Sequence, residues 1–370
     1  MANPVMIVAA KEFKDYLSSK RFLLIFAVLL VMCIAAIIAG VSTYNGQLAT
    51  YNQQLSRPTS SPLGGFIPQP TMPSILIIFE SFSISFVTVG WLLAIAIGFD
   101  LISKEKESGS LKLLLARPTF RDSIINGKIL GSTAVLIVAL AATFLVAIAL
   151  LLFQGIIPAW GDFTTLLTFF AMLVLFSLAF LAVALAASAL AKNSTLAILM
   201  AIGFVVFSLL VPSFSSSVGS IVLGPTPQQM IPSVAGNSSS ANAQAASNVG
   251  SGSSGGGTLF LSNNGTTETI NMQVNPAYTT YEHNMNMITD LVDLVSPTSD
   301  LTSISSDLLS SQTTSMSTSV NGHVENIMTS ISKSSGNSIS VLLLESISLL
   351  AITIVGFAIA YSRFMRMDVR

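Results

Sequence analysis

Six apolar segments, each close to the length that crosses a lipid bilayer, constrain this chain more than any other feature of its sequence. A transmembrane helix needs about 20 predominantly apolar residues to cross roughly 30 Å of hydrocarbon. The fifth segment is the shortest because Pro212 follows it, and the Ser-rich residues beyond Pro212 either continue the helix, re-enter the membrane or begin an outer loop. The sequence predicts an all-α polytopic membrane protein with six transmembrane helices, at Phe22–Gly40, Ile75–Phe99, Ile129–Phe153, Leu166–Ala191, Leu196–Val211 and Ile339–Tyr361.

The composition agrees with a membrane protein and excludes several other classes. Hydrophobic residues make up 52% of the chain and charged residues 9%, whereas about a quarter of the residues of a soluble domain are charged. The net charge of -1 provides no basic field, so nucleic acid is not an expected partner. The single cysteine, Cys33, lies in an apolar segment and forms neither an internal disulfide nor a thiolate metal cluster.

The distribution of Lys and Arg predicts the orientation in the membrane. With a cytoplasmic N-terminus, fourteen of the sixteen basic residues fall on the inner side, and only Arg57 and Lys333 fall outside. Both termini are then expected in the cytoplasm, and we expect the surrounding lipid bilayer to be the plasma membrane. A cleaved signal peptide is the alternative for the first segment, but its apolar run exceeds the usual length of about 7–15 residues, which favours a retained span.

The chain divides into four parts. Residues 1–21 place Ile7, Phe13 and Leu17 opposite Lys11 and Lys14, which is typical of an amphipathic elbow helix at the inner interface. A solvated basic leader that only sets the topology is the alternative. The other parts are the first five spans with a cytoplasmic loop, the outer insertion, and the last span with its tail, at residues 22–211 (loop 100–128), 212–337 and 338–370.

The outer insertion at 212–337 is rich in Ser, Asn, Gly and Thr, so its first part is predicted to be a flexible linker. Alternating apolar residues on both sides of Asn264-Gly265 predict a β-hairpin. Apolar residues then recur at helical spacing on either side of Pro297, with Leu301, Ile304 and Leu308 forming the second series. We expect a small extracytoplasmic α+β cap before the last span, without catalytic function.

No pattern of catalytic or metal-binding residues is present. The Gly127-Lys128 pair is followed by Ile129, and Asp122 stands where a phosphate-binding loop needs its first glycine. We therefore expect no cofactor in this chain, and any energy source to be a separate subunit. His283 and His323 have no ligand-type residues at suitable spacing, so surface histidines are favoured over a metal site.

Two acidic residues lie inside predicted spans. Glu80 is about 7 Å and Glu345 about 9 Å from the outer ends of their spans, at 1.5 Å per residue. Both begin the pattern Glu-Ser-x-Ser, which adds Ser83 and Ser348. A carboxylate facing lipid is costly, so these four residues are candidates for a translocation path or a subunit interface. The alternative is a position near the headgroups, with the serines bonded to the helix backbone.

The cytoplasmic loop between spans two and three carries the family resemblance. The stretch DLISKEKESGSLKLLLARPTFRDSIINGK, residues 100–128, resembles the signature of type-two ABC exporter permeases of the NosY-like branch. The N-terminal KEFKDYLSSKRF is similar to the elbow helix of that family, and LAKNSTLA joins spans four and five. The resemblance covers nearly the whole chain except the Ser-rich outer segment.

The resemblance implies a coupling helix in this loop, seated on an ABC ATPase subunit. Leu111, Leu114 and Leu115 independently form a helical apolar stripe suited to a groove. A loop half-buried in the inner headgroups is the alternative. The residues expected to couple to the ATPase are Lys104, Glu105, Lys106, Glu107, Gly109, Leu111, Leu114, Leu115, Pro118 and Arg121.

The family further implies a non-catalytic half-transporter that pairs with a second permease copy, identical or not, and with two ATPases. A non-transporting scaffold or sensor, with the outer insertion as its binding module, is the main alternative. A secondary transporter is disfavoured because spans three and four lack charges. An intramembrane enzyme is disfavoured because no catalytic constellation lies within the spans.

Overall fold

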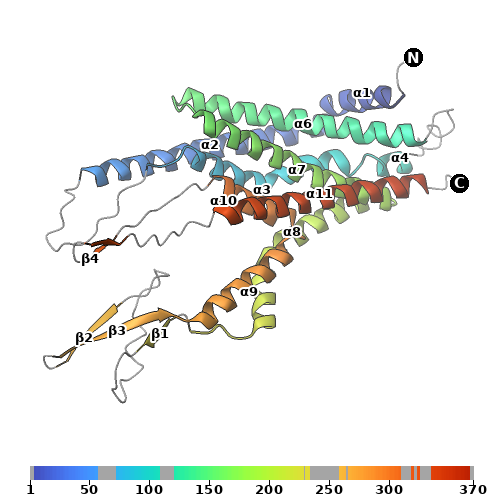
Figure 1. Ribbon diagram of the computed structural model, residues 1–370. Helices are drawn as coiled ribbons and strands as arrows, with labels where there is room; N and C mark the ends of the chain where they lie inside the picture. The colour runs from blue at the N-terminus through green and yellow to red at the C-terminus, as the bar shows by residue number, and fades with distance from the viewer. Residues whose placement is uncertain are drawn as a thin grey trace. The chain divides into compact units, whose positions relative to one another are not determined.

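Six long helices dominate the computed structural model (Figure 1). The structure describes residues 4–56, 72–108, 121–228, 230–233, 258–263, 266–309, 318–320, 323–325 and 335–366. Each long helix is apolar and long enough to cross a membrane, which confirms the six predicted spans. They are α2 (Lys20–Leu55), α3 (Leu76–Gly98), α6 (Arg121–Phe153), α7 (Trp160–Leu190), α8 (Ser194–Leu223) and α11 (Ser335–Met365). A separate amphipathic helix, α1 (Pro4–Leu17), precedes them, as expected of the elbow.

The chain forms two compact units, one made of residues 1–210 with 294–370 and the other of Val211–Asp293. In the first unit, α7 is the central helix and packs against α3, α6 and α11. Phenylalanines of α3 interleave with those of α7 in this core. Phe82 and Phe169, for example, meet edge to face with ring centroids 6.3 Å apart, a favourable geometry for aromatic pairs.

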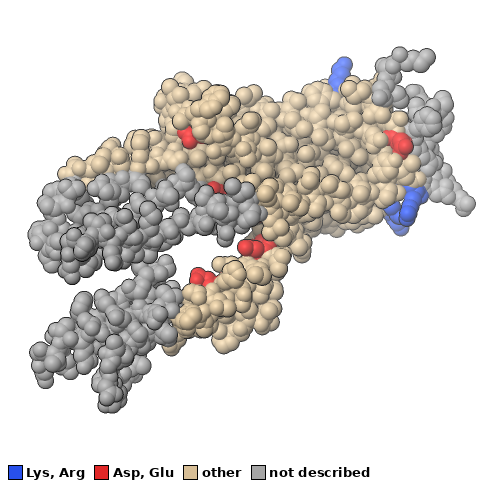
Figure 2. All heavy atoms as spheres, in the orientation of Figure 1, with Lys and Arg blue, Asp and Glu red and all other residues tan. Residues whose placement is uncertain are grey.

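One face of the first unit carries a wide belt in which no charged side chain is visible (Figure 2). On the face drawn in Figure 2, the visible Lys and Arg side chains lie at the end of the bundle that carries α1 and the C-terminal part of α11. Such a belt matches the hydrocarbon layer of a bilayer.

The fifth long helix, α8, continues through Pro212 to Leu223, whereas the sequence prediction ended this span at Val211. A proline within a helix has no N–H for the carbonyl four residues earlier, which here belongs to Ser208. The hydroxyls of Ser296 and Thr298 donate to this carbonyl oxygen at 2.7 and 2.9 Å. All three residues are buried. These two hydroxyls replace the missing donor, so the helix passes the proline without leaving a buried carbonyl unsatisfied.

The short helix α10 (Pro297–Leu309) packs among membrane helices and does not form part of an outer cap as the sequence prediction had it. It lies against α3, α7 and α11. Ile304 clusters with Ala179 of α7 and Leu349 of α11, which both lie inside predicted spans. Eight of the thirteen residues of α10 are buried. Within the membrane, backbone that is not part of a span is tolerated only where protein surrounds it. Helix α10 meets that condition.

The second unit contains the C-terminal part of α8, a small sheet and α9 (Pro276–Asp293). Strands β1 (Met230–Ser233), β2 (Thr258–Asn263) and β3 (Thr266–Val274) form an antiparallel sheet in the order β1-β3-β2. Strands β2 and β3 pair on either side of Asn264-Gly265, where the hairpin was predicted; these two residues lie outside the described ones. Elsewhere, β4 (Thr318–Val320) pairs with β5 (His323–Glu325). The side of the membrane on which the insertion lies stays a prediction.

Candidate functional site

The elbow helix α1 docks onto α6 through two glycines spaced four residues apart. A Cβ atom on Gly127 would lie 2.6 Å from Cβ of Val8, and one on Gly131 would lie 2.8 Å from the carbonyl oxygen of Ala9. Real Cβ atoms do not approach other atoms so closely, so only glycine permits this contact. Small residues at four-residue spacing let two helices approach to backbone contact. The position of α1 is therefore determined by the sequence Gly-Lys-Ile-Leu-Gly of α6.

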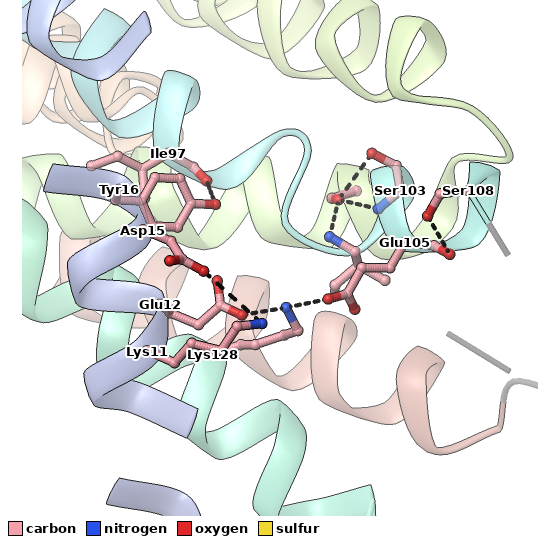
Figure 3. A network of polar contacts seen from close by, with 11 residues as sticks. Lys11, Glu12, Asp15, Tyr16, Ile97, Ser103, Glu105, Ser108 and Lys128 are labelled. Atoms are coloured by element: carbon pink, nitrogen blue, oxygen red, sulfur yellow. Dashed lines mark hydrogen bonds and ion pairs between the residues drawn. The ribbon is translucent and has the colours of Figure 1, made fainter. Parts of the chain in front are cut away.

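Lys128, within that motif, joins three elements of the structure (Figure 3). Its Nζ lies 2.8 Å from Oε1 of Glu12 on α1 and 2.8 Å from Oε1 of Glu105 on α4 (Ser103–Glu107). The Lys128 side chain is only 3% exposed. A buried charge is tolerated when it is paired and hydrogen-bonded, and Lys128 meets two carboxylates. We refer to Glu12, Glu105 and Lys128 as the Lys128 bridge.

Tyr16 adds a second connection between α1 and the membrane helices. Its hydroxyl donates a hydrogen bond to the carbonyl oxygen of Ile97, near the end of α3, at 2.8 Å. Burial, together with the nearby carboxylates of Asp100, Glu12 and Glu105, raises the pKa of Tyr16 well above its ordinary value. Tyr16 is therefore a neutral hydrogen-bond donor over the whole physiological pH range.

The five-residue helix α4 is fixed to the turn between α7 and α8. Ser188 Oγ on α7 accepts hydrogen bonds from the backbone N–H groups of Ile102 and Ser103, at 3.0 and 2.9 Å. The ammonium of Lys106 donates to the carbonyl oxygens of Ala189 and Ala191 at the C-terminus of α7, at 2.6 and 3.1 Å. A cation at this end also complements the helix dipole.

Glu107 connects α4 to the start of α8. Its Oε2 accepts hydrogen bonds from the hydroxyl and the backbone N–H of Ser194, at 3.0 and 3.3 Å. A carboxylate at a helix N-terminus satisfies a donor that has no partner within the helix. Helix α4 thus contacts α6, α7 and α8, and Lys128 of α6 connects it to the elbow helix.

The predicted coupling residues fall into four groups. Lys104 is exposed, whereas Glu105, Lys106 and Glu107 bind within the chain as described above. Arg121 begins α6, and nothing is described of its side chain. The remaining members lie outside the described residues: Gly109, Leu111, Leu114, Leu115 and Pro118. Contact of this set with an ATPase stays a prediction.

The two Glu-Ser-x-Ser patterns, which begin at Glu80 and Glu345, lie on α3 and α11. Both helices pack against α7 and α10. Glu80 is half-buried and Glu345 is buried. Ser348 donates a hydrogen bond to the carbonyl oxygen of Leu294. Ser83 is fully buried, and its hydroxyl has no hydrogen-bond partner among the described residues. Their role in a translocation path stays a prediction.

Sequence reasoning overlooked Glu12, Tyr16 and Ser188 as site residues. Glu12 and Tyr16 lie in a helix that the sequence analysis considered only for its apolar and basic faces. Ser188 lies within an apolar predicted span that itself contains no charged residue. The spacing of Gly127 and Gly131 was the available signal, because it predicts a partner helix packed closely on α6.

A pocket of about 260 Å³ opens beside the Lys128 bridge. Its polar lining comes from α1, from the turn that follows α3, from α4 and from α6. The charged residues in the lining are Lys11, Glu12, Asp15, Asp100, Lys104, Glu105 and Lys128.

Comparison with known families identifies the chain. The family model described as ABC-2 family transporter protein matches residues 6–369, which is nearly the whole chain. A search of curated proteins found no match. Members of this family are membrane permeases of ABC transporters and work in general with an ATPase partner. The chain belongs to the ABC-2 transporter family and is a multi-pass membrane permease component of an ABC transporter.

Proposed function

We propose that the chain is the non-catalytic permease subunit of an ATP-driven exporter in the plasma membrane, with both termini in the cytoplasm. ATP and Mg²⁺ bind to a separate ATPase subunit, and two permease copies with two ATPases form the working transporter. The distribution of basic residues supports the orientation, because fourteen of sixteen fall on one side.

The observation that carries this proposal is the anchoring of α4 at the base of the loop at residues 109–120. Through Glu105, Lys106 and Glu107, this short helix holds α6 and the α7–α8 turn. A force that an ATPase applies to the loop would therefore move several membrane helices together and would not only displace the loop itself. ATP-driven closure of the ATPases would rotate these helices as a group and alternate access to the membrane path.

Affinity purification from the native membrane in mild detergent tests the assembly. We expect a P-loop ATPase in the eluate at near one-to-one stoichiometry, with measurable ATP turnover. Recovery of the chain alone without turnover would favour the alternative, a scaffold or sensor. The separate compact unit Val211–Asp293 would then be its binding module.

Substitution in the loop tests the coupling itself. Leu114→Ala should reduce ATPase co-purification or uncouple ATP hydrolysis from transport, because it removes the centre of the apolar stripe. Leu167→Ala is a matched control, since Leu167 is an exposed leucine on α7 away from the loop. Wild-type coupling in Leu114→Ala would contradict the proposal.

A further inference from the structure

The pocket beside the Lys128 bridge contains a surplus of negative charge. Its lining holds four carboxylates, from Glu12, Asp15, Asp100 and Glu105, but three ammonium groups. The ammonium of Lys128 is already bound to two of these carboxylates. Lys11 and Asp15 form only a loose exposed pair at 4.0 Å. Asp100 makes no ion pair within that distance in the part of the chain that the structure describes. Its side chain is hydrogen-bonded to Tyr16, and Lys104 is the strongest cationic influence on it.

The size of the pocket limits what can occupy it. Its volume is about 260 Å³. Pockets for drug-sized ligands are larger, at roughly 300–1,000 Å³. The pocket therefore suits a small polar group that carries a cation for Asp100 and, because Lys11 and Lys104 also line the pocket, an anion as well.

The surroundings of the pocket place it at a membrane surface. Helix α1 forms one wall, and Met6, Ile7 and Leu17 on this helix are exposed apolar residues. An amphipathic helix with such a face lies in the interfacial layer, with its apolar side towards the acyl chains. The polar groups available at that level are lipid headgroups.

We propose that this pocket binds the headgroup of phosphatidylethanolamine. The ammonium binds Asp100, aided by Asp15, and the phosphate binds Lys104 and Lys11. The placement in the inner leaflet rests on the orientation given under the proposed function; the binding chemistry does not. A choline headgroup has no N–H donors for Asp100 and is bulkier, and a glycerol headgroup brings negative charge without a cation into a pocket that already has surplus carboxylates.

A bound headgroup would join the same elements as the Lys128 bridge. Lys11 and Asp15 belong to α1, whereas Asp100 and Lys104 lie at the junction of α3 and α4. The lipid therefore tightens the attachment of the elbow helix to the base of the loop, and the inner leaflet composition regulates how rigidly the loop is held.

Native mass spectrometry of the purified permease tests the proposal without any ATPase or transport assay. The delipidated protein in detergent is titrated with phosphatidylethanolamine, phosphatidylcholine or phosphatidylglycerol of identical acyl chains. We expect one phosphatidylethanolamine to bind at least about tenfold more tightly than either other lipid, since a hydrogen-bonded charge pair accounts for that factor. The absence of this preference would overturn the proposal.

Two variants then locate the binding to the pocket. Asp100→Asn should abolish the preference, and Lys104→Gln, at an exposed position, should weaken binding several-fold without affecting the fold. Asp122→Asn makes the same chemical change on α6 outside the pocket and should retain the preference. A preference that persists in Asp100→Asn, or binding that is unchanged in Lys104→Gln, would refute this site. A preference lost equally in Asp122→Asn would show a general charge effect instead.

Discussion

Replacing Lys128 with methionine should destabilise the protein because it removes the charge of the Lys128 bridge and keeps most of the length and apolar stem of the side chain. The two carboxylates left behind are poorly solvated, with side-chain exposures of 12% for Glu12 and 18% for Glu105. Removing one partner of a buried ion pair costs about 3–5 kcal/mol, because it leaves an uncompensated charge. Here two carboxylates lose their shared cation, so we expect the upper half of that range.

The corresponding change in thermal stability is measurable. At an unfolding entropy of roughly 2.1 cal/mol/K per residue, 370 residues give roughly 0.8 kcal/mol/K. A loss of about 4–5 kcal/mol then lowers the unfolding midpoint by about 5–6 °C. The two tryptophans of the chain provide a fluorescence signal for unfolding in detergent.

A triple variant separates charge from packing. Glu12→Gln, Glu105→Gln and Lys128→Met together remove every charge of the Lys128 bridge, and buried ion pairs replaced in this way are often neutral for stability. The triple variant should therefore recover most of the lost stability. Lys11→Met is the matched control, because its side chain is 65% exposed and its pair with Asp15 is loose. A triple variant as unstable as Lys128→Met, or a neutral Lys128→Met, would refute the reasoning.

Three further predictions concern the glycine contact of the elbow helix, the proline within α8 and the hydroxyl of Tyr16. Gly131→Leu should detach the elbow helix, so that its backbone unfolds and trypsin cleaves after Lys11 and Lys14, whose side chains are already exposed. Gly203→Ala, with no atom within 4 Å of the added Cβ, should leave the digestion pattern unchanged. The double variant Ser296→Ala, Thr298→Val should destabilise the protein by about 1–3 kcal/mol, the cost of leaving the buried carbonyl of Ser208 without a donor. Adding Pro212→Ala restores a backbone N–H for this carbonyl and should recover stability. No recovery would contradict the account of α8. The pKa of Tyr16 is raised in the folded state, so on alkalinisation the unfolded chain loses this proton before the folded protein does. Stability should therefore fall above about pH 10. A series of melting curves at increasing pH should show a smaller fall in Tyr16→Phe than in the unchanged protein.

The spans were predictable from the sequence because a single physical requirement, about 20 apolar residues for each crossing, leaves a strong pattern. The start of α3 was predicted to within one residue on this basis. The end of α8 was not, because Pro212 interrupts the local pattern and the groups that satisfy Ser208 lie almost ninety residues later in the chain. Tertiary contacts decided that boundary, and a local pattern cannot show them.

The position of α10 was mispredicted for a related reason. Its Ser, Thr and Asp residues are typical of a solvated segment, and only Leu301, Ile304 and Leu308 indicate an apolar face. In the structure its small side chains permit close packing against membrane helices, and its hydroxyls bond within the protein. Polarity alone does not distinguish a solvated helix from one enclosed by protein at membrane depth.

The buried polar residues of the spans show where helices that do not cross the membrane are attached. Lys128 of α6 binds the elbow helix α1, Ser188 of α7 binds α4, and Ser208 of α8 receives the start of α10. A polar group within a span is costly unless it is satisfied, and each non-spanning helix brings backbone or side-chain groups that satisfy it. These polar contacts therefore hold each short helix at one position along its span, since an apolar contact alone would allow the helix to shift along it. This explains how a chain with few charges holds three short helices at defined depths, and why movement at the loop is expected to reach the spans through these few polar contacts.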